Sequence, residues 1–280
     1  MRLAIISDVH GNLTALEAVL TDMRDPSGAL PERIVCLGDV AQMGPQPHET
    51  IVRLRALGCP VIMGNTDDKL IKRVERLAIA SDTSDTTEPL AKHGKETSKT
   101  APDEKQRSRE INWWTARQVT ADDLTYLRTF VPTLEVALGS AEGGRALLCC
   151  HGSPRSYNDR TEATTPDEKL GDWLADVDEA RVGIVASGHT HLQMLRRYQA
   201  LTLLNPGSVG MPLMEVKPGE FRLAPCAEYA ILTYDGQQPG LRIELRRVSY
   251  NTSAVIAGFL ASDMPHTEWT TTDWQALPHR

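Results

Sequence analysis

Six short apolar runs, each closed by glycine and polar residues, constrain the fold of this chain more than any other feature. They read RLAIISDVHGN, RIVCLGDV, PVIMGNTDD, RALLCCHGSP, VGIVASGHTH and LTLLNPGS, starting at residues 2, 33, 60, 145, 182 and 201. Runs of this length that are rich in Val, Ile and Leu on both faces are typical of strands buried between helix layers. The chain is therefore expected to form an α/β fold.

Helical patterns separate the early runs. Residues 13–24 and 47–58 carry apolar residues at helical spacing, with Asn12 placed to cap the first helix and Gly58 to end the second. Alternation of strand and helix predicts a parallel sheet built from right-handed crossovers. Residues 111–130 predict two more helices, the second capped by Thr120, and residues 132–139 a strand.

The remaining segments suggest one domain with an insertion and a tail. Residues 229–236 and 241–250 predict a hairpin, and residues 251–262 a helix packed on the domain. The stretch 81–110 has almost no large apolar residue, which predicts a flexible polar insertion. We therefore expect a domain over 1–262, interrupted at 81–110, and a C-terminal tail over 263–280 that two tryptophans anchor.

Charge and cysteine usage narrow the class of protein. The net charge of −7 disfavours nonspecific nucleic-acid binding, which needs a basic face. Five cysteines without a CxxC pattern argue against a disulfide framework and indicate a reducing compartment. No apolar stretch is long enough to span a bilayer, and the chain begins with a strand rather than a signal peptide. We expect a cytoplasmic protein without membrane contact; the sequence is silent on oligomeric state.

Polar residues with ligand chemistry follow five of the apolar runs. The carboxyl ends of strands in open α/β sheets converge on one edge, where ligands bind. Four of the eight histidines lie at these points. The residues concerned are, in chain order, Asp8, His10, Asp39, Asn65, Asp67, His151, His189 and His191.

Each of these short motifs is weak when taken alone. DxH occurs mostly in surface loops, GD and GN are common in turns, and a histidine at a strand end is more often structural than a ligand. The ordered set, each member at a strand terminus, is hard to reach by accident, so we interpret it as a metal site.

The donor set indicates which metals would fit. Nitrogen and oxygen donors without thiolate suit Mn²⁺, Fe, Zn²⁺, Co²⁺ or Ni²⁺, and the set is too rich in imidazole for Ca²⁺. Seven donors exceed what one ion with an open position needs. Two ions about 3.5–4 Å apart, bridged by a carboxylate, would use them all, activate a bridging hydroxide and neutralise a phosphoryl group.

The order D-x-H, GD, GN-x-D, H-G and GHTH resembles the calcineurin-like metallophosphoesterase superfamily. DVHGN, GDVAQMGPQP, GNTDD and NPGSVGMP resemble its compact bacterial and archaeal phosphodiesterase-like branch, and the likeness covers the chain except residues 81–110 and the tail. It implies a four-layer α/β sandwich of two mixed sheets flanked by helices. It also implies hydrolysis of phosphate mono- or diesters of small molecules or nucleotides, with Mn²⁺ favoured in vitro.

The same resemblance implies a role for each residue. Asp8, His10, Asp39 and His191 would hold one ion, with Asp39 bridging, and Asn65, His151 and His189 would complete the second. Asn65, Asp67 and His151 are the expected catalytic residues, and Asn12, Asn65 and Thr66 the expected substrate-binding residues. Asn12 and Asp67 would also orient ligands. The turn at 205–210 offers backbone amides near the site, or is simply a tight turn.

Thr66 departs from the family pattern. Relatives that act on proteins have His after the GN asparagine, and many small-molecule relatives have Cys. A threonine hydroxyl is too weak an acid to protonate a leaving alcohol near neutral pH. We therefore expect a preference for leaving groups such as phosphate or phenol-like oxygens, unless another acid, His48 for instance, takes part.

Two other readings compete with a small-molecule hydrolase. A scaffold or interaction protein of the same fold would not require all seven donors. A nuclease is disfavoured by the acidic balance and by the lack of basic–aromatic clusters.

Overall fold

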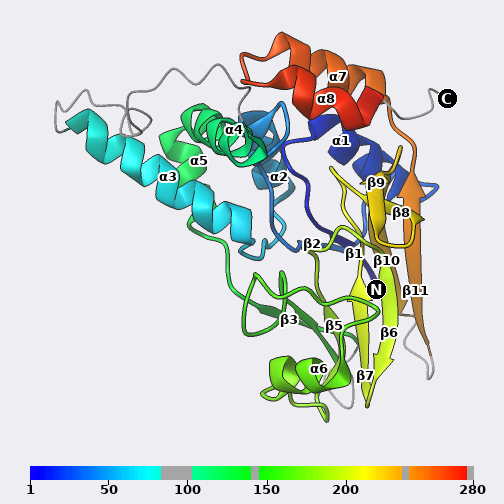
Figure 1. Cartoon of the computed structure of the whole chain (residues 1–280). Coiled ribbons are helices and arrows are strands. Elements are labelled where there is room, and N and C mark those ends of the chain that lie inside the picture. Colours follow the sequence, from blue (N-terminus) through cyan, green and yellow to red (C-terminus); the bar gives the residue numbers. More distant parts are fainter. Residues whose placement is uncertain (83–102, 140–144, 235–239, 276–280) are drawn as a thin grey trace.

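The computed structural model describes residues 1–82, 103–139, 145–234 and 240–275. Two mixed sheets lie face to face, with helices on both outer sides (Figure 1). The four-layer α/β sandwich that the resemblance implied is confirmed. No helix among the described residues is both long and apolar enough to cross a membrane.

The first sheet has four strands in the order β11-β10-β1-β2. β1 and β2 are parallel and joined through α1, whereas β10 is antiparallel to both β1 and β11. The predicted hairpin is therefore confirmed. The elements are β1 (Arg2–Ile6), α1 (Leu13–Asp22), β2 (Arg33–Cys36), β10 (Ala227–Tyr234) and β11 (Leu241–Val248).

The second sheet has five strands in the order β3-β4-β5-β7-β6, with β4, β5 and β7 parallel and both edge strands antiparallel. A separate two-stranded sheet pairs β8 with β9. The strands are β3 (Leu134–Ala137), β4 (Ala146–Cys149), β5 (Val182–Ala186), β6 (Met194–Tyr198), β7 (Leu201–Asn205), β8 (Leu213–Lys217) and β9 (Glu220–Leu223).

Helices cover both outer faces. Most of them lie against the first sheet, and α6 lies on the far side of the second, at the bottom of Figure 1. The remaining helices are α2 (Pro47–Leu57), α3 (Asn65–Asp82), α4 (Glu104–Gln118), α5 (Ala121–Leu127), α6 (Asp167–Leu174), α7 (Thr252–Ala261) and α8 (Thr267–Gln275).

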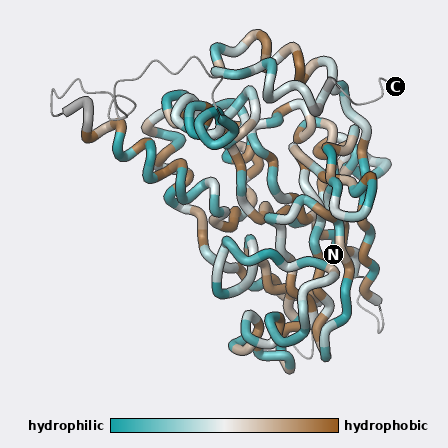
Figure 2. Tube along the Cα trace, in the orientation of Figure 1, coloured by the Kyte–Doolittle hydropathy of each residue, from teal (hydrophilic) through white to brown (hydrophobic). Residues whose placement is uncertain are grey.

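Strand alternation builds two cores from the same strand. Ala4 and Ile6 of β1 face the helices and pack with Leu16 of α1, whereas Leu3 and Ile5 face the second sheet. A third apolar cluster joins the second sheet to α6. Figure 2 shows hydrophobic stretches along the central strands and hydrophilic ones on the outer helices. These buried strands hold their carboxyl ends, and the loops that follow, in fixed positions.

Local signals predicted several helix ends. The Asn12 side chain accepts a hydrogen bond from Ala15 N at the start of α1. Gly58 ends α2 in the left-handed conformation, with φ 64°. Thr120 forms a capping box with Asp123 at α5, and Asn251 caps α7.

Three sequence predictions differ from the structure. Residues 60–63 do not form a strand: Val61 and Ile62 make only isolated bridges, and Asn65 starts α3 immediately afterwards. Both ends of the range 81–110, expected to belong to a flexible insertion, are helical: α3 continues to Asp82 and α4 begins at Glu104. Residues 83–102 lie outside the described residues. Within the expected tail, α8 forms a helix in which Trp274 is buried.

Candidate metal centre

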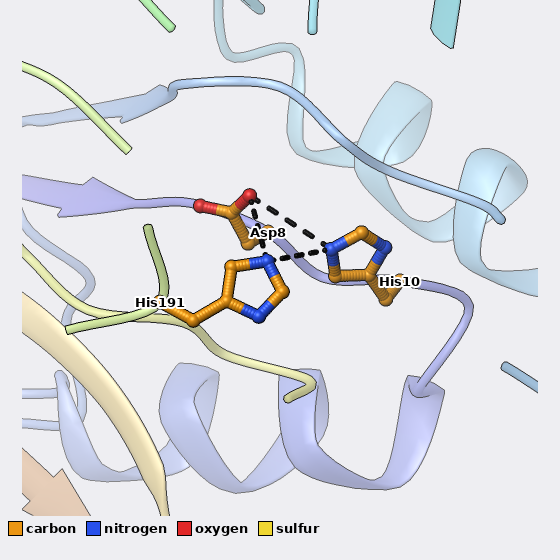
Figure 3. A group of neighbouring side chains, drawn as sticks. All are labelled: Asp8, His10 and His191. Carbon is orange, nitrogen blue, oxygen red and sulfur yellow. Dashed lines mark hydrogen bonds and ion pairs between the residues drawn. The ribbon is translucent and has the colours of Figure 1, made fainter. Parts of the chain in front are cut away.

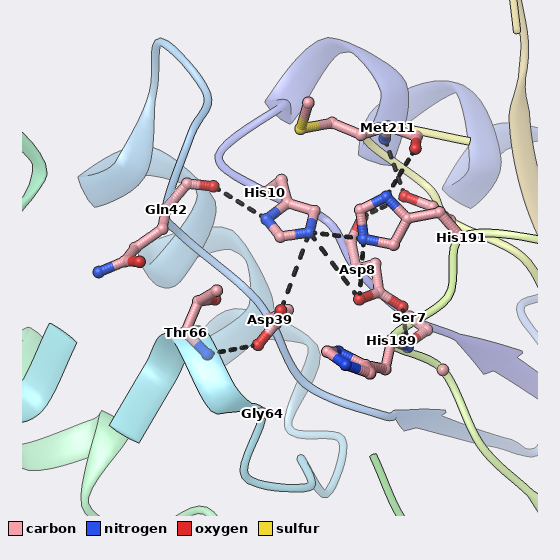
Figure 4. Close-up of polar contacts among 12 residues, drawn as sticks. Ser7, Asp8, His10, Asp39, Gln42, Gly64, Thr66, His189, His191 and Met211 are labelled. Carbon is pink, nitrogen blue, oxygen red and sulfur yellow. Dashed lines mark hydrogen bonds and ion pairs between the residues drawn. The ribbon is translucent and has the colours of Figure 1, made fainter. Parts of the chain in front are cut away.

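The loops that follow β1, β2, β4 and β5, together with the start of α3, bring the predicted ligands to one place. Figure 4 shows five of them, Asp8, His10, Asp39, His189 and His191. Two groups of three donors satisfy metal-ligand spacing, with all donor atoms of a group within 4.8 Å of one another. The first group is Asp8, His10 and His191, and the second is Asp39, His151 and His189.

The first group presents acceptor atoms to one another (Figure 3). His10 Nδ1 lies 3.0 Å from the carbonyl of Gln42, and His191 Nδ1 lies 2.8 Å from the carbonyl of Met211. A carbonyl only accepts, so both Nδ1 atoms donate, and in the neutral form of each ring Nε2 carries the lone pair. The two Nε2 atoms are nevertheless 3.0 Å apart.

The carboxylate of Asp8 adds a third acceptor to this group. Its Oδ1 lies 3.3 Å from His191 Nε2 and 3.8 Å from His10 Nε2. This oxygen is buried and has no hydrogen-bond donor among the described residues. Three convergent acceptor atoms in a buried place are stabilised by a proton or a metal cation between them, and this donor set fits a metal ion.

The second group repeats the arrangement around His151. Its Nδ1 donates to the carbonyl of Leu37 at 2.7 Å, so that the neutral form of this imidazole carries its lone pair on Nε2. This Nε2 lies 3.0 Å from Asn65 Oδ1 and 3.5 Å from Asp39 Oδ1. The ring of His189 lies 5.2 Å, centroid to centroid, from that of His151. Asn65 thus reaches the group from the first residue of α3.

Asp39 stands between the two groups. Its Oδ1 faces His151, and its Oδ2 lies 3.9 Å from His10 Nε2 in the first group. One carboxylate oxygen is therefore turned to each group, which is the arrangement that a bridging ligand needs. The backbone amide of Thr66 also donates to Oδ1 at 2.9 Å.

The close approach of these charged groups shifts their pKa values. Burial disfavours protonated His151, but the charge of Asp39 raises the pKa of His151 to about 10. Burial, together with the neighbouring His151, lowers the pKa of His189 to about 4. Burial opposes ionisation of Asp39, yet His151 keeps the pKa of this carboxyl well below its usual range. The opposite charges of Asp39 and His151 thus stabilise each other in this buried cluster.

Asp67 lies behind Asp39 and holds the loop. Its two carboxylate oxygens accept the backbone amides of Asp39 at 2.7 Å, Val40 at 2.9 Å and Gly64 at 3.0 Å. Burial and the charge of Asp39 raise the pKa of Asp67 to about 7. The side chain is completely buried, so it acts on the site through the backbone of the Asp39 loop.

The other predicted site residues occupy distinct places. Asn12 caps α1 and donates to the carbonyl of Gly210. The Thr66 hydroxyl is buried and has no hydrogen-bond partner among the described residues. His48, considered as a substitute acid, makes a 2.6 Å contact with Asp123 of α5. The His48 imidazole, which would have to give a proton to the leaving group, is therefore held by the Asp123 carboxylate.

Five of the seven predicted ligands have a left-handed backbone. Asp8, His10, Asp39, His189 and His191 have φ between 49° and 67°. Non-glycine residues seldom adopt this region, which costs of order 1–2 kcal/mol per residue. Such strain persists only where the surrounding structure enforces it, and it is concentrated at functional sites.

Two glycines show why the ligand loops need that residue. A Cβ atom on Gly64 would lie 2.1 Å from Asp39 Oδ1, and one on Gly188 would lie 2.7 Å from Asp8 Oδ2. Both distances are far below van der Waals contact, so a side chain there would displace a predicted ligand. Gly64 and Gly188 thus leave room for the carboxylates of Asp39 and Asp8.

Several supporting residues escaped the sequence analysis. Ser7 donates to Asp8 Oδ2 at 2.5 Å, and Ser208 donates to the carbonyl of Asp8 at 2.7 Å. Asn205 donates to Gly188 O and to Thr190, and so holds the GHTH loop. The turn at 205–210 therefore supports the site from behind. Apart from the turn itself, the sequence gives no signal for these roles, because they depend on long-range contacts.

Comparisons with known proteins agree with this geometry. The model of the calcineurin-like phosphoesterase superfamily domain matches residues 1–235. An uncharacterized protein of Methanocaldococcus jannaschii is 23% identical and aligns with 95% of this chain and 94% of its own. A metallophosphoesterase from Sphaerobacter thermophilus has a solved structure that covers 99% of both chains, with 26% identity and a TM-score of 0.66. A hypothetical protein from Pyrococcus horikoshii shares the fold, with 17% identity, coverage of 95% and 94%, and a TM-score of 0.68.

Proposed function

Because the chain belongs to the calcineurin-like phosphoesterase superfamily, we propose that it hydrolyses phosphate mono- or diesters of small molecules or nucleotides with two bound transition-metal ions. The observation that carries this proposal is the pair of donor groups joined by Asp39, in which buried acceptor atoms face one another. Donors of this kind suit Mn²⁺, Fe, Zn²⁺, Co²⁺ or Ni²⁺. When bound, such ions supply an activated water and neutralise phosphoryl oxygens.

Residue roles follow from the geometry. Asp8, His10 and His191 would hold one ion, and His151, His189 and Asn65 the other, with Asp39 shared. The hydrogen bonds from Nδ1 fix the tautomers of His10, His151 and His191, so that Nε2 faces the site.

The Asn65 side chain is the best-placed amide for a phosphoryl oxygen. Its Oδ1 is directed toward His151, and the same amide carries two N–H donors that could bind substrate. Asp67 keeps the Asp39 loop in place through three backbone amides, so it is a positioning residue rather than one that touches substrate.

A scaffold role explains these observations less well. A buried carboxylate oxygen without a donor reduces folding stability, because the desolvation of that oxygen is not compensated. Binding to a partner surface elsewhere gives no reason to keep such an oxygen, whereas a metal ion does.

The decisive experiment combines metal analysis with turnover. Full-length protein loaded with Mn²⁺ should hydrolyse a chromogenic phosphodiester or phosphomonoester, lose that activity on chelation and regain it on adding Mn²⁺. Asp39→Asn should reduce kcat/KM at least about 100-fold, since the shared ligand is weakened. Asp25→Asn alters a carboxylate in an exposed loop and serves as the matched control.

A screen of nucleotides and phosphorylated metabolites with the same protein then identifies the substrate class. Metal-replete protein without turnover above buffer on any phosphoester would contradict the hydrolase proposal and leave the scaffold as the better account. Activity retained on single-stranded DNA at moderate salt would favour the nuclease instead.

A further inference from the structure

A second polar cavity lies between α3 and α4, outside the metal centre. It has a volume of about 470 Å³ and is lined by Arg73, Glu104, Lys105, Ser108, Arg109 and Asn112. None of these residues belongs to either donor group. Figure 1 shows the two helices side by side, and Figure 2 shows α4 as mostly hydrophilic. We call this cavity the α3–α4 pocket.

Helical spacing explains why α4 contributes so much to the pocket. Lys105, Ser108, Arg109 and Asn112 are separated by three or four residues, so they share one face of the helix. Ile111 and Thr115 are buried and face the protein. The polar stripe of α4 is therefore turned toward Arg73 on α3 rather than toward the core.

The guanidinium of Arg73 lacks a hydrogen-bond acceptor for one of its nitrogens in this pocket. Its Nη1 is buried and has no hydrogen-bond acceptor among the described residues. Burial and the neighbouring Arg76 lower the pKa of Arg73, yet a guanidinium stays charged in proteins. A buried donor that carries charge and has no acceptor is costly, and an anion would remove that cost.

The charge of the pocket also favours an anion. Arg73, Lys105 and Arg109 are opposed by the single carboxylate of Glu104. The whole chain carries a net charge of −7, so this local excess of positive charge runs against the overall balance. Asn112 also lines the pocket and carries two amide N–H donors that can bind an anion.

We propose that the α3–α4 pocket binds a phosphate-bearing anion, held by Arg73, Lys105 and Arg109. This site goes beyond the proposed hydrolase function. Arg73 follows Asn65 by eight residues on one helix, so the two backbones are about 12 Å apart along its axis. The anion would therefore not share donors with the metal centre.

The test measures binding of inorganic tripolyphosphate to full-length protein by isothermal titration calorimetry. The protein is stripped of metal with a chelator, which is then removed, so that the metal centre cannot capture the probe. We expect one binding site, weakened by added salt because the charges are partly exposed. Arg73→Gln and Arg109→Gln should each raise Kd about tenfold, as expected when a charged hydrogen bond is lost.

Two control variants sharpen the result. Arg117→Gln removes the same charge from the exposed last turn of α4, away from the pocket, and should leave Kd unchanged. Glu104→Gln removes the opposing carboxylate and should tighten binding. Thermal melting shows whether each variant is folded. If Arg73→Gln fails to fold, Lys105→Gln, which changes an exposed residue of the pocket, takes its place in the test.

The proposal is overturned if metal-stripped protein binds no tripolyphosphate, or if Arg73→Gln and Arg117→Gln change Kd equally. Binding that appears only after metal is restored would assign the anion to the metal centre and would also overturn it. The titration does not depend on turnover, so failure of the hydrolase proposal would leave this result interpretable.

Discussion

At the scale of single residues, the positions of the candidate ligands depend on the residues packed directly behind them. Asp39 directs one oxygen to each donor group, and the backbone amide of Asp39 donates a hydrogen bond to the carboxylate of Asp67. Gly64 and Gly188 leave only enough space for the neighbouring carboxylates of Asp39 and Asp8. Small changes behind the ligands should therefore alter metal binding as much as changes in the ligands themselves.

Gly64→Ala should weaken metal binding although it removes no donor. The new Cβ would overlap Asp39 Oδ1, so the carboxylate must move and metal affinity should fall about 10- to 100-fold. Calorimetric titration of each variant with metal measures this change in affinity. Gly258→Ala in α7 is the control, because its Cβ meets only Pro45 at ordinary distance. Equal affinities for both variants would show that Asp39 is not a ligand.

Thr66 leads to a prediction about leaving groups. Its hydroxyl is a poor proton donor near neutral pH, so kcat/KM for aryl phosphates should fall steeply as the leaving-group pKa rises. Thr66→His should flatten that dependence by supplying an acid. Rates over a series of substituted aryl phosphates measure both slopes. A shallow slope for the unaltered protein would mean that another residue protonates the leaving group.

At the scale of elements, strand position determines what each loop can offer. β1, β2, β4 and β5 are parallel partners in their sheets and deliver their following residues to the same region. The helix α3 adds Asn65 and Asp67 from its first turn. Loops that are anchored in this way hold ligands more rigidly than free loops do.

β10 carries a buried carboxylate that should make stability depend on pH. Burial raises the pKa of Glu228 to about 7, although Arg247 on β11 opposes the shift. In the unfolded chain Glu228 loses its proton near pH 4.5. The folded state therefore holds the proton more tightly, and its stability should fall as pH rises from about 4.5 to about 7.

Glu228→Gln should remove this part of the pH dependence. At pH 8 the variant should gain up to about 3 kcal/mol, reduced by the lost interaction with Arg247. Denaturant unfolding of the metal-stripped protein at several pH values measures the effect. Glu244→Gln changes a partly exposed carboxylate on β11, paired with Arg246, and is the control. An unchanged slope in Glu228→Gln would show that Glu228 is ionised in the folded protein.

Elements with local signals were the ones that the sequence predicted well. Asn12 and Gly58 mark helix ends through their own side-chain or backbone chemistry, and β10 and β11 show a clear hairpin pattern. The helix α3 was missed because its first turn, NTDD, contains residues that were interpreted as a turn with ligands. The β8–β9 pair was missed because its exposed strands lack a buried apolar face.

In the candidate site, too, features with a local sequence signal were predicted and those without one were not. Residue types and their order after each strand predicted which donors lie together, and the structure brings them into two groups. The sequence could not reveal that Asp67 holds backbone amides, or that Ser208 and Asn205 support the loops. Those contacts join residues far apart in the chain, and no local pattern encodes them.

At the scale of the whole molecule, metal binding and folding should be coupled. Seven predicted ligands come from both sheets and from α3, so bound ions would tie these layers together. Metal at 100 times Kd should stabilise the folded state by about 2.7 kcal/mol per site, and raise Tm by roughly 5 °C or more.

Calorimetric melting with and without Mn²⁺ checks this expectation, and metal analysis should give two ions per chain. His10→Ala should retain one ion and lose part of the rise in Tm. A Tm that does not respond to Mn²⁺ in the unaltered protein would contradict coupling between the two sheets through metal.

The left-handed backbone of the five donor residues has a consequence for protein engineering. Glycine at any of these positions would relax the local torsion, with part of the gain offset by glycine's freedom in the unfolded chain. Selection for heat resistance alone would therefore tend to replace these candidate metal ligands before it changed residues of the core. A thermostable variant of this protein should be sought with metal binding as a second criterion from the first round.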